Sequence, residues 1–334
     1  MSGKVTVIVP YYNVEKYIGK CLSSLNKQDY PDYDVILVDD KSPDGSRAIV
    51  ERYVARYPEK FRLMVNEENM GQGRSRMSAV EATDAEYIMF VDSDDYVAKD
   101  YISTFVKAAQ GKSDKKALDG CDMVISGFTK DIQGNLKRFS VADSPFTILL
   151  YPVACCKLYR RDFLIRNRID FSDSRKGEDI YFSLATFYSR PRFKVIKYYG
   201  YFYRLNPTST TSSMNYENGF EEIVKDMFDK FRANFDVSKM NDRMKQAVEY
   251  TYIANMVNAL VVYGHGSKPG RMRKKVELIN KDISDNYPNL MQNPYMGLLK
   301  PSSVSLKIRL GVGAFYWTRR FGLDKLMFDF ISLI

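Results

Sequence analysis

The chain has 334 residues, 45% of them hydrophobic and 27% charged, a balance that excludes disorder of the whole chain and allows one large or two modest domains. Its formal net charge of +9 favours an anionic partner, such as nucleic acid, a phosphate-bearing substrate or an acidic lipid surface, without choosing among them. One histidine and four cysteines without paired spacing argue against a Ser-His-Asp triad, a zinc site and a disulfide framework.

The first hundred residues alternate between short apolar runs and helical spacing, which is typical of a βαβ protein. The sequence predicts strands at residues 5–9, 35–38, 61–66 and 86–91, and helices at residues 15–26, 44–57 and 71–81. This order implies a parallel sheet. Ligands of open α/β sheets bind beyond the carboxyl ends of the strands, so the candidate site comprises the loops at residues 10–13, 39–42 and 92–95.

The pattern changes along the rest of the chain. Residues 122–128 predict another strand and residues 179–188 a helix, which would complete the same domain. Long helical segments follow at residues 219–235 and 243–262, and then a basic patch from Lys268 to Lys281. We therefore predict an α/β domain over residues 1–215 and a helical C-terminal region over residues 216–334.

The N-terminus and the apolar segments indicate where in the cell the protein is expected. The first ten residues lack the basic, apolar and small-residue regions of a signal peptide. The apolar stretches are far shorter than the roughly 20 residues that span a bilayer. We expect a cytoplasmic protein without a transmembrane helix.

The strongest single feature is an apolar strand that runs into an acidic turn, Phe90-Val91-Asp92-Ser93-Asp94-Asp95. Along an extended chain Asp92 and Asp94 project to the same side, so both carboxylates can face one ligand. One or two carboxylates together with substrate phosphates are the usual ligands of Mg²⁺ or Mn²⁺. The alternative is an acidic loop that caps a helix at Tyr96. The motif alone does not decide between them.

The acidic turn belongs to a longer series of motifs in a characteristic order. The series comprises Val7-Ile8-Val9-Pro10-Tyr11-Tyr12-Asn13, Val38-Asp39-Asp40-Lys41-Ser42-Pro43-Asp44-Gly45, Asn69-Met70-Gly71-Gln72-Gly73-Arg74-Ser75-Arg76, Val91 to Asp95, Lys157-Leu158-Tyr159-Arg160-Arg161, Gly177-Glu178-Asp179, and Tyr203-Arg204 followed by Ser209 and Thr211. In this combination the chain resembles the family 2 inverting glycosyltransferases with the GT-A fold. The resemblance covers roughly the first 215 residues and implies a mixed sheet flanked by helices.

The resemblance implies a UDP-sugar donor. It assigns the nucleotide sugar to Pro10, Tyr12, Asp40, Arg76, Asp92, Ser93, Asp94 and Arg204. Pro10, Tyr12 and Asp40 would line the uridine pocket, Asp40 accepting a hydrogen bond from the uracil imide. A turn organised by Asp39 and Asp40 is the alternative for that acid pair.

The same resemblance assigns the phosphate end of the donor. Asp92 would contact the ribose, and Asp94 would hold the Mn²⁺ or Mg²⁺ that bridges the diphosphate. Arg204, with Ser209 and Thr211, would close over the diphosphate, since a guanidinium suits phosphate oxygens. Arg76 would help hold the nucleotide, although Met77 replaces the usual following Asn. Solvated helix arginines are the alternative for Arg74 and Arg76.

The acceptor side of the reaction is also implied by the resemblance. Asp179 would be the general base that deprotonates an acceptor hydroxyl, and Glu178 would orient the acceptor. An acidic first turn of a helix is the alternative for this pair. Lys157 would contact the acceptor, although Cys155 and Cys156 replace the aromatic residue and Asn that usually precede it. We interpret these cysteines and His265 as structural.

The C-terminal segment from Ser305 to Ile334 has apolar residues at approximately helical spacing with basic residues between them. The apolar positions are Leu306, Leu310, Trp317, Phe321, Met327, Phe330, Ile331 and Ile334. This suits a cationic amphipathic helix on an anionic membrane surface, to which the basic patch from Lys268 to Lys281 would add attraction. A helical layer packed on the catalytic domain or on a second subunit is the alternative.

Together these features predict a metal-dependent inverting hexosyltransferase that uses a UDP-sugar and a saccharide or lipid-linked acceptor in cell-surface polysaccharide synthesis. It would act at the inner face of the cell membrane, and homo-oligomerisation stays open. The alternative is a non-catalytic nucleotide-sugar or membrane-binding module. We do not expect nucleic acid binding, because no binding motif accompanies the basic residues. A dinucleotide-dependent oxidoreductase is disfavoured, because Pro-Tyr-Tyr-Asn stands where a Gly-x-Gly-x-x-Gly would follow the first strand.

Overall fold

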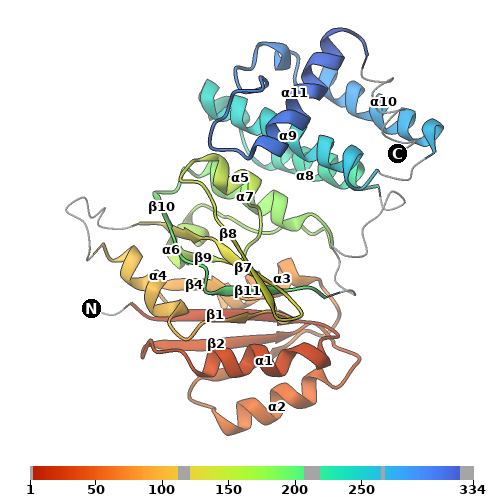
Figure 1. The fold of residues 1–334 in the computed structure, drawn as a ribbon. Helices are drawn as coiled ribbons and strands as arrows, with labels where there is room; N and C mark the ends of the chain where they lie inside the picture. The colour runs from red at the N-terminus through yellow and green to blue at the C-terminus, as the bar shows by residue number, and fades with distance from the viewer. Residues whose placement is uncertain (1–2, 112–120, 207–218, 265–267, 324–334) are drawn as a thin grey trace. The chain divides into compact units, whose positions relative to one another are not determined.

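The computed structural model describes residues 3–111, 121–206, 219–264 and 268–323 (Figure 1). It divides the chain into two compact units, one comprising Met1–Asp143 and Pro152–Asn206 and the other Ser144–Tyr151 and Pro207–Ile334. The segment Ser144–Tyr151 therefore belongs with the C-terminal part of the chain. The predicted boundary at residue 215 lies outside the described residues.

A seven-stranded sheet forms the core of the first unit (Figure 1). In spatial order its strands are β10 (Phe193–Ile196), β6 (Met123–Ser126), β9 (Lys157–Arg160), β4 (Tyr87–Phe90), β1 (Val5–Tyr11), β2 (Tyr33–Asp39) and β3 (Phe61–Val65). The strands β1 to β4 pair in parallel, as the sequence predicts. The sheet as a whole is mixed, because β9 runs antiparallel to both β4 and β6.

A second sheet of four strands contributes one wall of the site described below. Its order is β5 (Tyr96–Val97), β11 (Tyr201–Arg204), β7 (Phe128–Ile132) and β8 (Asn135–Phe139). The predicted strand at residues 122–128 therefore ends early: β6 stops at Ser126, and Phe128 begins β7 in the other sheet. Since β5 follows the acidic turn directly and pairs with β11, the turn lies where the two sheets meet.

Helices connect these strands. They are α1 (Glu15–Asn26), α2 (Ser46–Arg56), α3 (Gln72–Glu81), α4 (Tyr101–Ala109), α6 (Arg161–Arg166) and α7 (Glu178–Tyr188). The apolar face of α1 buries Ile18, Cys21, Leu22 and Leu25, while every residue of β1 is buried. Each aliphatic side chain buried in this way stabilises the folded state by about 1.5–3 kcal/mol. The loops at the carboxyl edge of the sheet are therefore anchored to a well-packed core.

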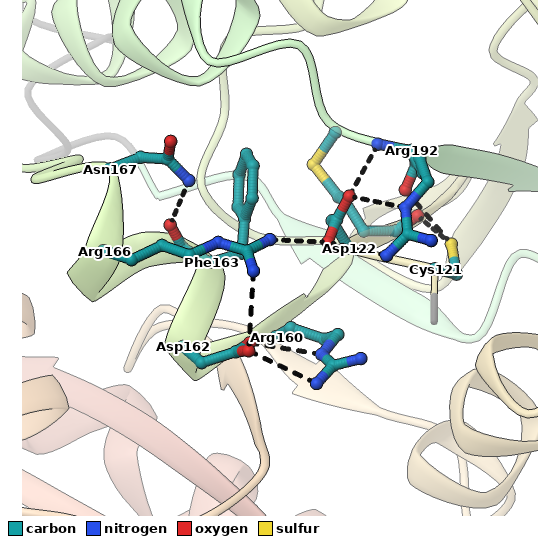
Figure 2. A network of polar contacts seen from close by, with 9 residues as sticks. Cys121, Asp122, Arg160, Asp162, Phe163, Arg166, Asn167 and Arg192 are labelled. Carbon is teal, nitrogen blue, oxygen red and sulfur yellow. Dashed lines mark hydrogen bonds and ion pairs between the residues drawn. The ribbon is translucent and has the colours of Figure 1, made fainter. Parts of the chain in front are cut away.

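A polar cluster ties together the strands at the edge of the sheet opposite β3 (Figure 2). The buried carboxylate of Asp122 accepts hydrogen bonds from Arg166 Nη2 at 3.2 Å and from the backbone N–H and Nε of Arg192 at 2.9 and 3.2 Å. Its backbone N–H donates to the Arg192 carbonyl, and its carbonyl accepts from Arg160. Asp122 therefore connects the start of β6 to three neighbouring parts of the chain, which are β9, α6 and the segment that leads into β10.

We predict that Asp122→Ala lowers the free energy of unfolding by about 2 kcal/mol, because the two arginines and a backbone N–H lose a buried acceptor. Chemical denaturation followed by circular dichroism measures this. Asp162→Ala is the matched control: Asp162 pairs with Arg160 and Arg166 in the same cluster but is half exposed, and its loss should cost less than about 0.5 kcal/mol. Equal losses in the two variants would contradict the assignment.

The second unit is helical over its described residues. Its elements are α5 (Phe146–Leu150), α8 (Phe220–Asn234), η1 (Val237–Lys239), α9 (Asp242–Val261), α10 (Pro269–Asn286), η2 (Leu290–Gln292) and α11 (Leu306–Arg320). The long helix α9 contacts α5, α8, α10 and α11, and it buries apolar residues around most of its circumference. Among the described residues, no helix is both long enough and apolar enough to cross a bilayer.

The structure corrects two predictions from the sequence in this unit. The predicted amphipathic helix from Ser305 ends at Arg320, because Gly322 adopts a left-handed conformation with φ +70°. Its remaining apolar positions, Met327, Phe330, Ile331 and Ile334, lie outside the described residues. Lys275 of the basic patch is buried, and its ammonium contacts both carboxylate oxygens of Glu221 at 2.7 Å. Lys275 is therefore not available to a membrane surface.

Candidate active site

The loops after β1 and β2 hold each other in place. Asp39, the last residue of β2, accepts a hydrogen bond from the Ser42 backbone N–H at 2.9 Å, and Ser42 Oγ accepts one from the Asn13 N–H at 3.1 Å. Asn13 and Lys41 both have positive φ values, which turn the chain sharply at the sheet edge. The turn considered for the Asp39-Asp40 pair is thus present, and Asp39 organises it.

Asp40 organises a second loop. Its buried carboxylate accepts hydrogen bonds at 2.8 Å each from Asn66 Nδ2 and from the backbone N–H groups of Met70 and Gly71. These contacts fix the chain that leads into α3. The contact of Asp40 with uracil stays a prediction, as do those of buried Pro10 and of Tyr12, whose side chain is 48% exposed at the end of β1.

The acidic turn after β4 is held by the second sheet. Asp95 is buried, and its carboxylate accepts hydrogen bonds from Tyr201 Oη and from the Arg204 backbone N–H, both at 2.7 Å. Tyr201 Oη also accepts a bond from the Asp92 N–H at 3.2 Å. The Arg204 guanidinium donates from Nε to the Asp94 carbonyl and from Nη2 to the Tyr17 carbonyl at 3.0 Å. Asp95 therefore positions the turn, whereas the carboxylates of Asp92 and Asp94 take no part in these contacts.

The donor set of this turn fits a hard divalent cation. Burial raises the pKa of the Asp94 carboxyl, and the nearby charge of Asp92 raises it further, which is the electrostatic situation that a cation relieves. Asn206 Nδ2 donates to Asp94 Oδ2 at 3.1 Å and orients that carboxylate. The described residues contain no cluster of three or more His, Cys, Asp and Glu side chains able to hold a metal. A metal held by Asp94 would therefore take further oxygen ligands from a bound phosphate or from water.

Arg76 connects the acidic turn to the second pair of acids. Its side chain is only 1% exposed, and Nη2 donates to Asp92 Oδ1 at 2.7 Å while Nη1 donates to Asp179 Oδ1 at 3.2 Å. The guanidinium also lies over the Phe171 ring, 5.3 Å from its centroid. Burial lowers the pKa of Arg76, but the carboxylates Asp179 and Asp92 outweigh this and raise it. The solvated-arginine alternative is therefore wrong for Arg76, whereas Arg74 is exposed.

Glu178 and Asp179 lie in the first turn of α7. The acidic first turn of a helix that was considered as the alternative for this pair is therefore present. Gly177 precedes them with φ +79°, a left-handed conformation that lets the chain turn into the helix. Gln72 Nε2 donates to Glu178 Oε1. Gly73 allows α3 to approach closely, because a Cβ there would fall 2.7 Å from Phe171 Cβ and 3.3 Å from Glu178 Cγ. The two acids are thus seated against Gln72 and Arg76, one helical turn apart on α3.

The two acids differ in environment. Glu178 is buried, and burial together with the charge of Asp179 raises its pKa to about 7. The Asp179 side chain is 27% exposed; burial raises its pKa, and the charge of Arg76 opposes this. A partly accessible carboxylate with a raised pKa can accept a proton from a ligand, which suits general base catalysis.

Lys157 lies within the protein. It is buried, its ammonium donates to the Val153 carbonyl, and burial lowers its pKa to about 8. Its charge also acts on Asp179, whose pKa it lowers. The acceptor contact stays a prediction. Cys155 and Cys156 are buried, and burial raises the pKa of the Cys155 thiol, which makes it a poor nucleophile.

Sequence reasoning missed several residues that shape this site. Gln72 could have been found from its spacing, because positions 72 and 76 lie on the same face of a helix. Tyr201 and Asn206 carry no local signal, since each acts on the acidic turn from more than a hundred residues away. The predicted Ser209 and Thr211 and the structural His265 lie outside the described residues.

The model of the family described as "Glycosyl transferase family 2" matches residues 6–167. The uncharacterized glycosyltransferase EpsJ of Bacillus subtilis is 30% identical over 245 residues, which cover 68% of each chain. The chain belongs to glycosyltransferase family 2.

Another relative of this family 2 chain is the poly(ribitol-phosphate) beta-glucosyltransferase of Bacillus spizizenii, which is 28% identical over 242 residues, 69% of this chain and 37% of the relative. This family 2 chain thus spans little more than a third of that relative. Among solved structures, residues 1–349 of TarS from S. aureus in complex with UDP-GlcNAc match with a TM-score of 0.67 at 22% identity, over 96% of this chain and 92% of that one. This match confirms the expected GT-A fold.

The raised pKa of Glu178 predicts a pH-dependent cost in stability. Because its pKa is about 7 in the folded chain against an ordinary 4.5, the contribution of Glu178 to stability is largest below pH 4.5 and falls as pH rises from 4.5 to about 7. Glu178→Gln removes the charge and keeps the acceptor for Gln72. We expect this variant to exceed the wild type at pH 8 by up to about 3 kcal/mol in free energy of unfolding, with the difference vanishing below pH 4.5.

Thermal unfolding at a series of pH values measures this difference. Glu81→Gln on α3 is the matched control, because Glu81 is exposed and its substitution should leave the pH profile of stability unchanged. A Glu178→Gln variant whose stability runs parallel to the wild type across the range would contradict the prediction.

Proposed function

We propose that this chain transfers a hexose from a UDP-sugar to a saccharide or lipid-linked saccharide acceptor, with inversion of the anomeric centre and with Mn²⁺ or Mg²⁺ as cofactor. The observation that carries the proposal is the bridge through Arg76, which joins the acidic turn and the acid pair of α7 in one site. A donor diphosphate and an acceptor hydroxyl need these two kinds of group side by side.

Residues of α7 carry out the acceptor half of the reaction. Asp179 takes the proton from the acceptor hydroxyl, whose oxygen attacks the anomeric carbon on the side opposite UDP. One base is sufficient for such a direct displacement. The raised pKa of Asp179 makes it a stronger base than an exposed aspartate, and Arg76 holds it in place at 3.2 Å. Glu178, bonded to Gln72, orients the acceptor.

The acidic turn and the loops beside it bind the donor of the reaction. Tyr12 packs against the base, Asp40 and Pro10 complete the uridine pocket, and Asp92 contacts the ribose. Asp94 would hold the metal ion, which when bound neutralises the charge on the departing diphosphate. Arg204 supplies a further positive charge next to the turn, where it already contacts the Asp94 carbonyl. The nearby carboxylates would otherwise repel a diphosphate.

Two similar proteins support the choice of substrates. The B. spizizenii relative is a poly(ribitol-phosphate) beta-glucosyltransferase, and the TarS structure contains UDP-GlcNAc. We therefore propose that this chain works in bacterial cell-surface polysaccharide synthesis, in the cytoplasm and at the inner face of the membrane.

UDP release from a panel of UDP-sugars, with Mn²⁺, Mg²⁺ or EDTA, tests the proposal. We expect one donor to give metal-dependent release that Asp94→Ala lowers by about 10³-fold. Once an acceptor is found, Asp179→Asn should lower transfer by about 10² to 10⁴-fold and leave UDP binding intact. Asp162→Asn, an exposed acid on α6, is the control.

Absence of UDP binding in a calorimetric titration would overturn the site assignment. UDP binding without turnover of any donor and acceptor pair would favour the non-catalytic nucleotide-sugar module.

The charge of Arg76 predicts how the rate depends on pH. Its positive charge lowers the pKa values of Asp179 and Glu178, so Arg76→Gln should move the acidic limb of the kcat/KM profile to higher pH by about one unit or more. Arg76→Lys keeps the charge and should leave the limb in place, although the loss of one of the two bonds lowers kcat. Arg74→Gln, an exposed neighbour, is the control. An unmoved limb in Arg76→Gln would exclude this coupling.

A further inference from the structure

Helix α11 of the second unit has two apolar faces. Val312 and Phe315 are buried and pack the helix onto its own unit. A separate stripe consists of Leu306, Leu310, Trp317 and Phe321, which are 59%, 49%, 42% and 67% exposed. At 100° per residue these four positions fall within an arc of about 60°, so they form one line along the helix surface. The burial of the helix therefore leaves this second face open.

Two exposed leucines lie in the preceding loop, which is held against α11. Arg309 Nη1 donates to the carbonyls of Leu298 and Leu299 at 3.4 and 3.1 Å, which holds the loop against α11. Gly313 makes room for it, since a Cβ there would fall 2.4 Å from Leu298 Cδ2. Leu299 is 83% exposed. We name these six side chains, Leu298, Leu299, Leu306, Leu310, Trp317 and Phe321, the α11 patch.

The segment that carries the α11 patch has charges of a single sign. Residues 286–323 contain no Asp and no Glu, but they contain the five basic residues Lys300, Lys307, Arg309, Arg319 and Arg320. Lys307 projects on one side of the exposed stripe, and Arg309 and Arg320 project on the other. Long basic side chains that flank leucine and aromatic residues can keep their charges at a polar boundary while the apolar groups enter a nonpolar phase.

This combination decides among the partners that could cover the patch. A second copy docking through the same surface would place these cations opposite one another, and like charges at an interface weaken association. The surface of a bilayer with anionic lipids supplies both a nonpolar layer for the leucine and aromatic side chains and phosphates for the basic ones. We propose that the α11 patch docks on an anionic membrane surface. This goes beyond the proposed transferase reaction and does not depend on it.

Trp317 offers a direct test, because it is the only tryptophan of the chain and lies within the patch. The full chain is mixed with phosphatidylcholine vesicles with or without phosphatidylglycerol, and both flotation and tryptophan emission are recorded. We expect flotation with the anionic vesicles, a shift of Trp317 emission to shorter wavelength, and protection from iodide. Raised salt should reverse all three.

Variants of exposed residues separate the two contributions. Leu310→Ser with Phe321→Ser should lower the partition coefficient by at least about tenfold, because two apolar side chains no longer enter the bilayer. Lys307→Glu with Arg320→Glu should lower it by at least about tenfold on anionic vesicles alone. The matched controls lie on and beside α9 in the same unit: Val262→Ser, at an exposed valine, and Arg243→Glu, at an exposed arginine. Neither should alter binding.

Three results would overturn the proposal. The chain could fail to bind anionic vesicles, or it could bind while Trp317 emission stays unchanged, which would place the contact elsewhere. Trp317 could instead already be shielded from iodide without lipid. In that case a dependence of the shielding on protein concentration would identify a second copy as the partner, and its absence would identify another segment of the chain. UDP binding, measured in parallel, reports on the catalytic unit separately.

Discussion

A buried guanidinium between two carboxylates is the interaction on which the candidate active site depends. Arg76 could not stay charged inside the protein without partners, since an unpaired buried charge costs several kcal/mol. Asp92 and Asp179 in turn would repel each other without the cation between them. The two carboxylates therefore permit the burial of Arg76, and α3, the acidic turn and the start of α7 must adopt their places together. The acidic turn and the acid pair of α7 are coupled through this one side chain.

The acidic turn itself is shaped by contacts of Asp95, whereas Asp92 and Asp94 contact Arg76 and Asn206. Asp95 takes its hydrogen bonds from Tyr201 and from the backbone of Arg204, so the second sheet holds the turn in place. The same arrangement brings Arg204 beside the turn. A site with this many carboxylates is poorly suited to a diphosphate unless cations compensate, which is the physical reason to expect a divalent ion there.

The segment that contains α11 is strongly basic. Residues 286–323 hold five basic residues and no acids, so they account for five of the nine net positive charges. The candidate active site meanwhile places several acids around the buried cation of Arg76. Both units are net positive by sequence, so the overall charge describes neither the acidic turn nor the basic segment at α11.

The sequence by itself determined the parallel order of β1 to β4, the helices between them and the three loops at their carboxyl ends, because these follow from local apolar periodicity and turn residues. It also placed Asp92, Asp94 and Asp179 among the candidate site residues, through short contiguous motifs and the family resemblance that they carry. Only the tertiary structure decided that Arg76 is buried between Asp92 and Asp179, that Tyr201 and Asn206 act on the turn, and that β9 runs antiparallel. It alone decided which apolar residues of α11 face outward. These features depend on contacts between residues far apart in the chain, and no local pattern encodes which distant partner a side chain will meet.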